Sequence, residues 1–260
     1  MARKEKKVFR ASLVAALTLL SALAFVAGRS RSAAVSHGAM PSAPSARSAA
    51  LETSYPAFTL ISSRTVTLTN GQTLRRSQVQ RSQRSDGIYK LVQTFYPVDG
   101  GKERLQTYFG FIGLGVFRLD EAGRRLIFKG PLIEESIGDI EQFLRANPAF
   151  AGEESVAGIR TIVWRQPGED GPEDFFEEHR APSLGGLVIK TVRVSGRERE
   201  VFEPTAIQMG EPPANLFSEL LSYPSDYSFY ERRVQEVEKH NEPDAAFMRQ
   251  LLERMRRVRP

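Results

Sequence analysis

The segment Tyr108–Leu119 reads YFGFIGLGVFRL, and its three glycines, Gly110, Gly113 and Gly115, stand among large apolar side chains. A dinucleotide-binding loop needs the order G-x-G-x-x-G between a strand and a helix. Here the order is G-x-x-G-x-G, apolar residues continue on both sides, and no helical pattern follows. The segment therefore predicts a long bent strand, in which glycine permits curvature or the close approach of another backbone.

Strand patterns flank this segment on both sides. Residues 60–68 alternate with period two and lead to Asn70-Gly71, a dipeptide typical of tight hairpins. Further turn sequences follow at Ser85–Gly87 and Asp120–Gly123. Eight or nine such strands predict a mainly β (α+β) fold, in which one curved antiparallel sheet, curled or closed like a half-barrel, packs against one or two helices. An N-terminal apolar helix precedes it.

One helix is predicted inside the sheet region. Ile137, Ile140, Phe143 and Leu144 recur at helical spacing, and Asn147-Pro148 ends the pattern. We expect this helix to cross the sheet and cover part of one face.

The N-terminus has the pattern of a targeting segment. Five Lys/Arg in the first ten residues precede an uncharged run, Ala11–Gly28. A basic head before an apolar run is typical of an export signal or a membrane anchor, and the composition leaves both open. Either one places residues 29–260 outside the cytoplasm, in the periplasm or anchored to the outer side of the inner membrane.

These patterns divide the chain into four parts. Residues 1–28 are a signal peptide or anchor, 29–50 an Ala/Ser/Pro-rich disordered linker, 51–230 the β-rich domain, and 231–260 a charged helical tail.

The charge distribution argues against a nucleic-acid partner. The whole chain carries +5, residues 1–31 carry +6 and residues 249–260 carry +4, so residues 32–248 carry −5. The basic excess therefore lies at the two ends, where it suits anionic lipid or an acidic partner rather than a basic groove across the fold.

The sequence indicates no catalytic or metal site and no cofactor. It contains no cysteine, which excludes disulfides and thiolate metal sites. His179, the one histidine inside the predicted domain, follows two glutamates but lacks a second histidine at ligand spacing. We expect it to be a solvated residue of an edge strand. The single tryptophan, Trp164, is expected in the core.

Three sets of residues are candidate binding sites. Strands that are apolar on both faces must cover both or leave one as a ligand surface, which singles out Phe109, Phe111, Ile112, Leu114, Val116 and Phe117. A basic run, interpreted either as an anion-binding strand or as a solvated edge strand, contains Arg75, Arg76, Arg81 and Arg84.

The third set belongs to the tail. An apolar stripe after Pro243 is surrounded by arginines, which predicts a short basic amphipathic helix. Its residues are Phe247, Leu251 and Met255 on the stripe, with Arg249, Arg254, Arg256 and Arg257 around it. This helix either packs back on the sheet, binds a partner or membrane surface, or is disordered.

The last part of the domain resembles a known type of exported protein. The elements that carry the likeness are Ala181-Pro182, Leu184–Gly186, Lys190-Thr191, Gly210–Pro212, Leu216-Phe217 and Pro224-x-x-Tyr227. They resemble the C-terminal half of lipoprotein-carrier-like (LolA-like) domains. That resemblance implies a curved half-barrel that binds an acyl chain, a lipidated protein or a peptide without catalysis. The sequence thus favours a lipid or envelope-protein partner, or alternatively a membrane-tethered interaction module that uses the sheet edge and the tail.

Overall fold

The computed structural model describes residues 54–131, 140–168, 171, 173–240 and 244–259. They belong to one compact unit, Thr53–Pro260. The predicted targeting segment and the whole of the predicted linker, residues 1–50, lie outside the described residues. Within the part described, no helix is both long and apolar enough to cross a bilayer.

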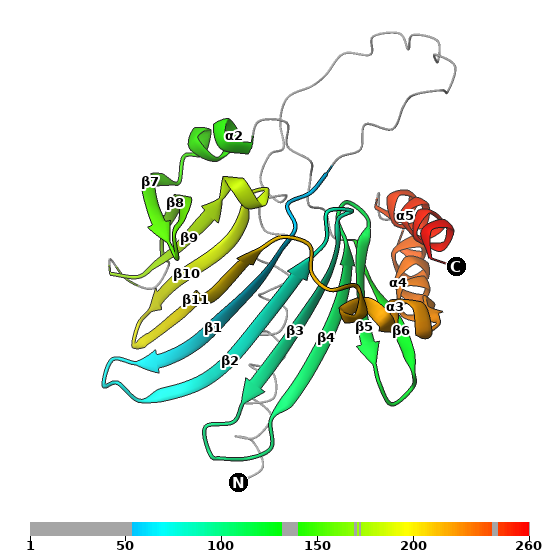
Figure 1. Ribbon diagram of the computed structural model, residues 1–260, viewed down its shortest axis with the longest axis horizontal. Helices are drawn as coiled ribbons and strands as arrows, with labels where there is room; N and C mark the ends of the chain where they lie inside the picture. Colours follow the sequence, from blue (N-terminus) through cyan, green and yellow to red (C-terminus); the bar gives the residue numbers. More distant parts are fainter. Residues whose placement is uncertain (1–53, 132–139, 169–170, 172, 241–243, 260) are drawn as a thin grey trace. The chain divides into compact units, whose positions relative to one another are not determined.

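Twelve strands form one curved, open sheet (Figure 1). They are β1 (Phe58–Leu68), β2 (Thr73–Gln83), β3 (Ile88–Tyr96), β4 (Arg104–Phe111), β5 (Gly115–Asp120), β6 (Arg125–Gly130), β7 (Phe150–Val156), β8 (Ile159–Pro167), β9 (Phe175–Ala181), β10 (Leu187–Ser195), β11 (Glu198–Met209) and β12 (Ser225–Asp226). Their order is β12-β6-β5-β4-β3-β2-β1-β11-β10-β9-β8-β7, and every pair is antiparallel except β12–β6. The predicted fold class is confirmed, and the sheet is not closed.

Local turn signals set the first hairpins. Gly71 at the β1–β2 turn and Gly87 at the β2–β3 turn have φ values of 84° and 82°, which glycine adopts at no steric cost. Strand β3 begins after the predicted turn at Ser85–Gly87, and β6 begins after the predicted turn at Asp120–Gly123.

The segment Tyr108–Leu119 is a hairpin, so the prediction of one bent strand is wrong. Residues 112–114 turn between β4 and β5, and the Leu114 N–H donates to the Phe111 carbonyl over 3.0 Å. Gly113 supplies the positive φ of 74° that this turn needs. The expectation of close approach is confirmed, because a Cβ on Gly115 would lie 2.7 Å from the carbonyl oxygen of Gly130.

Helices cover the sheet at both ends. They are α2 (Ile140–Ala146), η2 (Pro182–Leu184), η3 (Ala214–Phe217), α3 (Ser218–Ser222), α4 (Ser228–Lys239) and α5 (Ala245–Val258). Helix α2 packs at the β7–β8 end, where Leu144 contacts Ile162 and Trp164 and accepts a 2.7 Å hydrogen bond from the Trp164 indole. Trp164 is buried as predicted.

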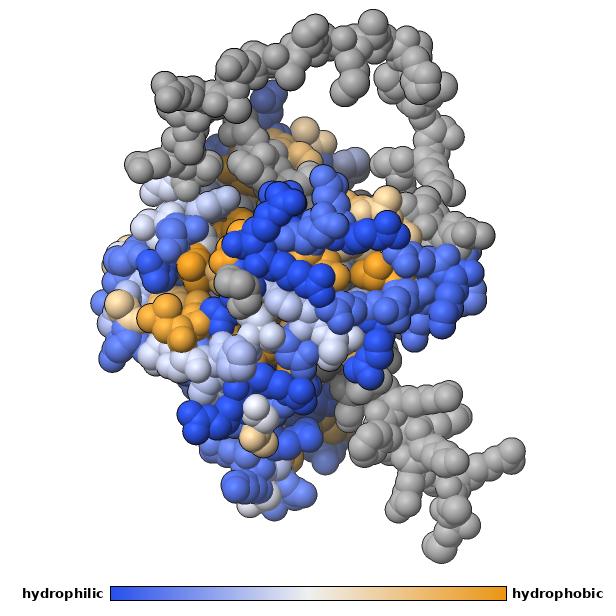
Figure 2. Space-filling model, turned by 90° about the vertical axis from the view of Figure 1, so that its right-hand side faces the viewer, coloured by the Kyte–Doolittle hydropathy of each residue, from blue (hydrophilic) through white to orange (hydrophobic). Residues whose placement is uncertain are grey.

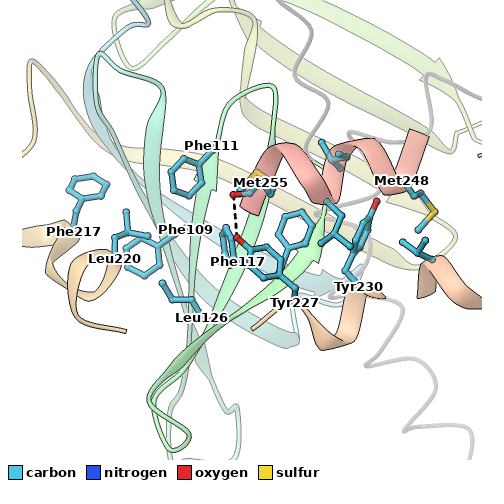
Figure 3. Packing of buried hydrophobic residues seen from close by; sticks show 14 residues of the cluster. Phe109, Phe111, Phe117, Leu126, Phe217, Leu220, Tyr227, Tyr230, Met248 and Met255 are labelled. Carbon is cyan, nitrogen blue, oxygen red and sulfur yellow. Dashed lines mark hydrogen bonds between the residues drawn. The ribbon is translucent and has the colours of Figure 1, made fainter. Parts of the chain in front are cut away.

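The largest core lies between β4–β6 and helices α3–α5 (Figure 3). We call it the helix-covered cluster, and its buried members are Phe109, Phe111, Phe117, Leu126, Phe128, Phe217, Leu220, Tyr227, Tyr230, Val234, Met248, Leu251, Leu252 and Met255. Phe117 is at its centre, with ring centroids 5.1 Å from Phe128 and 5.8 Å from Tyr227. The Tyr227 hydroxyl donates toward the Met255 carbonyl, which ties α5 to this layer.

Asp226 joins the sheet to α4. Its carboxylate accepts a 2.9 Å hydrogen bond from the Ser228 N–H and lies 2.9 Å from the Arg125 guanidinium. Hydrogen bonds from Ser228, and then the charges of Arg125 and Arg232, hold the pKa of this carboxyl below its usual range.

We expect Asp226→Ala to lower the free energy of unfolding by about 1 kcal/mol, the usual cost of losing a carboxylate at a helix N-terminus. Because the folded-state pKa is depressed, the charge stabilises the fold above the unfolded-state pKa of about 3.9 and stops doing so as pH falls through the lower folded value. Urea unfolding of wild type and Asp226→Asn at neutral and acidic pH checks this. An equal pH dependence in both proteins would contradict it.

Candidate functional site

Strands β4 and β5 separate below their last common pair. Their pairing runs from Phe111↔Gly115 to Tyr108↔Arg118, beyond which β4 pairs only with β3 and β5 only with β6. In Figure 1 the β3–β4 and β5–β6 hairpins diverge toward their turns. A cavity of about 250 Å³ lies at this divergence, which we call the β4–β5 opening, and it is lined by Leu105, Gln106, Thr107, Arg118, Leu119, Asp120 and Glu121.

One side of the β4–β5 opening leads toward the helix-covered cluster. Alternate residues of a strand share a face, so Leu105 and Thr107 are on the same face as Phe109, and Leu119 is on the same face as Phe117. Leu119 packs against the cluster. Leu105 keeps 59% of its surface exposed.

The other face carries charged side chains, Arg118 and Asp120 on β5. Arg118 pairs across the ladder with Tyr108 on β4 and Ile127 on β6. Lys129 lies two residues after Ile127 on β6. Phe128 pairs with Phe117 and Gly130 pairs with Val116, so Lys129 between them has no partner on β5 and is the extra residue of a β-bulge. A bulge redirects a side chain, and the Lys129 ammonium lies over the Phe229 ring of α4, 3.4 Å from its centroid.

Arg233 completes this group one helical turn after Phe229. Burial lowers the pKa of Lys129, and the charges of Arg118 and Arg233 lower it further. The charges of Arg118 and Arg233 therefore reach the Lys129 ammonium, and we call the three side chains the cationic cluster. Figure 2 views the side of the molecule that carries β5, β6 and α3–α5, where apolar patches lie between bands of charged residues.

The acidic side chains nearby are engaged elsewhere. Asp120 and Asp226 both pair with Arg125, over 3.0 and 2.9 Å, and Glu231 pairs with Arg256. Among the described residues, no carboxylate forms an ion pair within 4 Å of Arg118, Lys129 or Arg233.

The predicted apolar face and the predicted tail helix meet each other. Phe109, Phe111 and Phe117 are buried in the helix-covered cluster together with Leu251 and Met255 of α5 (Figure 3). The remaining members of the apolar set lie nearby: Leu114 packs against the cluster, Val116 is buried and Ile112 is in the hairpin turn. In this structure α3–α5 cover the face that the sequence singled out for a ligand.

The outer side of α5 carries the charges. Arg249 pairs with Glu238 and Arg256 with Glu231, both on α4. Arg254 and Arg257 are exposed, and Phe247 keeps 49% of its surface accessible.

The four arginines of the predicted basic run do not converge. Strand β2 lies between β1 and β3, so the interpretation of this run as an edge strand is wrong. Arg81 is buried and reaches the Gln83 side chain over 2.6 Å, while Arg84 pairs with Asp86 over 2.8 Å. Neighbours Arg75 and Arg76 are exposed and, by strand alternation, point to opposite faces.

His179 is fully buried, which corrects the prediction of a solvated edge residue. Strand β9 is flanked by β8 and β10, and the ring nitrogens lie 2.9 Å from Glu177 and 3.6 Å from Glu154. The described residues hold no group of three or more acidic, histidine or cysteine side chains suited to a metal ion.

Sequence reasoning missed the cationic cluster. The sequence pattern indicates only a strand at Arg118, and no motif singles out Lys129 or Arg233. The turn at Asp120–Gly123 implies that Arg118 faces a residue near Ile127, but the bulge that redirects Lys129 leaves no local signal.

No protein-family model matches the chain, and a search of curated proteins finds no match. Similar solved structures include the complex of Pseudomonas aeruginosa MucA and MucB, at 17% identity and TM-score 0.34, covering 62% of this chain and 56% of that one. A putative outer membrane lipoprotein-sorting protein domain from Vibrio parahaemolyticus matches at 10% identity and TM-score 0.27, over 64% of this chain and 91% of that one. LprF from Mycobacterium bovis matches at 10% identity and TM-score 0.28, over 61% and 88%. The chain spans little more than half of the first of these structures, and LolA-like folds are among the neighbours.

Proposed function

We propose that this chain is an exported, non-catalytic binding protein whose ligand or lipidated partner inserts an apolar chain at the β4–β5 opening. The single observation that supports the proposal most is the opening itself, a gap between two strands that is lined by the exposed Leu105 and by Leu119, which packs against the buried aromatic core.

The apolar path explains how a chain would be held. Inward from Leu105 on this face come Thr107, which is buried, and then Phe109, while Phe117 follows inward from Leu119; neither phenylalanine has exposed surface. Each methylene that leaves water at such a surface contributes about 0.8 kcal/mol. An apolar ligand chain that covers Leu105 would therefore gain binding free energy, because it removes the exposed surface of this side chain from water.

The cavity volume limits what binds without rearrangement. Ligand pockets for drug-sized molecules measure roughly 300–1,000 Å³, and this cavity of about 250 Å³ is slightly smaller. It takes the end of a chain, so a longer chain requires α3 or α5 to shift over the helix-covered cluster. A shift of α5 alone would break the Tyr227–Met255 hydrogen bond and the ion pairs of Arg249 and Arg256 with α4.

A matched pair of substitutions tests this proposal. Leu105 and Val98 are similarly exposed, at 59% and 58%, but only Leu105 lines the opening. We expect Leu105→Gln to weaken binding of a neutral fluorescent fatty alcohol about tenfold, the effect of losing one buried leucine, and Val98→Gln to bind like wild type. Fluorescence titration measures both affinities, and melting temperatures confirm that both variants fold. Wild-type protein that does not bind the alcohol, or equal affinities for the two variants, would contradict the proposal.

A further inference from the structure

We infer that Arg118, Lys129 and Arg233 bind the negatively charged head group, carboxylate or phosphate, of the ligand whose chain enters the β4–β5 opening. This inference rests on the proposed function and adds the chemical class of the ligand, an anionic amphiphile.

The three cations come from separate elements and are brought together by the fold. Arg118 lines the opening on β5, Lys129 is presented by the β6 bulge, and Arg233 lies on α4. Like charges repel, and each lacks an ion-pairing carboxylate among the described residues, so an anion placed between them relieves repulsion and supplies the missing partner. The depressed pKa of Lys129 agrees with this arrangement.

Phe229 supports the same assignment. It keeps 37% of its surface exposed, and its ring holds the Lys129 ammonium at 3.4 Å. A cation–π contact of this kind fixes a lysine without neutralising it. The lysine remains charged and positioned for an anion.

The positions of Arg118 and Leu119 at the opening determine the orientation of the ligand. Strand alternation places Arg118 on one face and Leu119 on the other, although both line the same cavity. A ligand that passes between β4 and β5 therefore meets Arg118 and Asp120 on one face, where Asp120 already pairs with Arg125, and Leu105, Thr107 and Leu119 on the other. That polarity matches an amphiphile rather than a wholly apolar chain. On the polar face, Gln106 also lines the cavity, and the Tyr108 hydroxyl donates to it over 2.9 Å.

The test compares two probes that differ only in charge. The full chain is titrated with a fluorescent fatty acid and with the corresponding fatty alcohol. We expect wild type to bind the acid about tenfold more tightly, the effect of a charge-assisted hydrogen bond, and this preference to weaken with salt. The double variant R118Q/K129Q should bind both probes with the affinity that wild type has for the alcohol.

Further variants separate charge from folding. Arg233→Gln alters an exposed helix residue and should lower the preference alone, whereas Arg118→Lys should retain most of it. Arg257→Gln removes an exposed arginine from α5 and serves as the control for general electrostatics, with no expected change.

Each outcome decides between the two claims. Equal wild-type affinity for acid and alcohol, or a preference that survives in R118Q/K129Q, overturns the head-group assignment and leaves the proposed function standing. Failure of wild type to bind either probe overturns both. Excess inorganic phosphate is expected to lower the affinity for the fatty acid to that for the fatty alcohol, because phosphate competes for the cationic cluster. An affinity for the acid that phosphate does not change, in a protein that shows no preference for the acid, contradicts the assignment.

Discussion

Replacing Phe117 by alanine is expected to lower the free energy of unfolding by about 4 kcal/mol, the upper part of the range for a buried phenylalanine. Phe117 has no exposed surface and contacts rings from three elements: Phe111 on β4, Phe128 on β6 and Tyr227 before α4. Its removal leaves a cavity at the junction of sheet and helices, which cannot close without moving both layers.

Urea denaturation measures this effect, with fluorescence of the single tryptophan as the signal. Leu105→Ala is the control, because Leu105 belongs to the same hairpin but is largely exposed and should change stability by less than about 0.5 kcal/mol. A loss below about 1 kcal/mol for Phe117→Ala would show that the helix-covered cluster is not a packed core.

The second large effect concerns Gly115. A Cβ there would lie 2.6 Å from the Phe128 ring and 2.7 Å from the Gly130 carbonyl oxygen, and the latter belongs to the backbone of the neighbouring strand. We expect Gly115→Ala to lower the free energy of unfolding by about 3 kcal/mol, since overpacking a fixed site costs that much. It should also distort the bulge that presents Lys129, because Gly130 is part of that bulge.

Gly113→Asn is the matched control in the same hairpin. No atom lies within 4 Å of a Cβ at this position, and asparagine tolerates a positive φ better than other residues. We expect it to cost less than about 1 kcal/mol. If both substitutions cost the same in urea unfolding, the close approach at Gly115 does not determine the register of β5 and β6.

The sheet was predictable where the signal is local. Asn70-Gly71 marks a hairpin through its own backbone preference, and residues 60–68 show their buried side by alternation. The same reasoning failed at Gly113, because a glycine in an apolar run is compatible with both a strand kink and a turn. Only the pairing of Phe111 with Gly115 separates the two.

The candidate site was less predictable because it depends on long-range packing. His179 has glutamate neighbours typical of a solvated strand, yet strands β8 and β10 on either side bury it. The cationic cluster joins residues 118 and 233, and the sequence contains no pattern that links them. The sequence also does not predict whether the apolar strands are exposed. Phe109 and Phe117 are buried because α5 packs over them, and that contact joins residues far apart in the chain.

Native mass spectrometry of residues 53–260, expressed with an export signal and purified without detergent, tests the central claim most directly. The account predicts that an acyl species co-purifies, or that a fatty acid added to the purified protein binds one to one, with about tenfold weaker binding to Leu105→Gln. Protein that shows only its apo mass, and that stays apo with excess fatty acid, would contradict the claim that the β4–β5 opening binds an amphiphile.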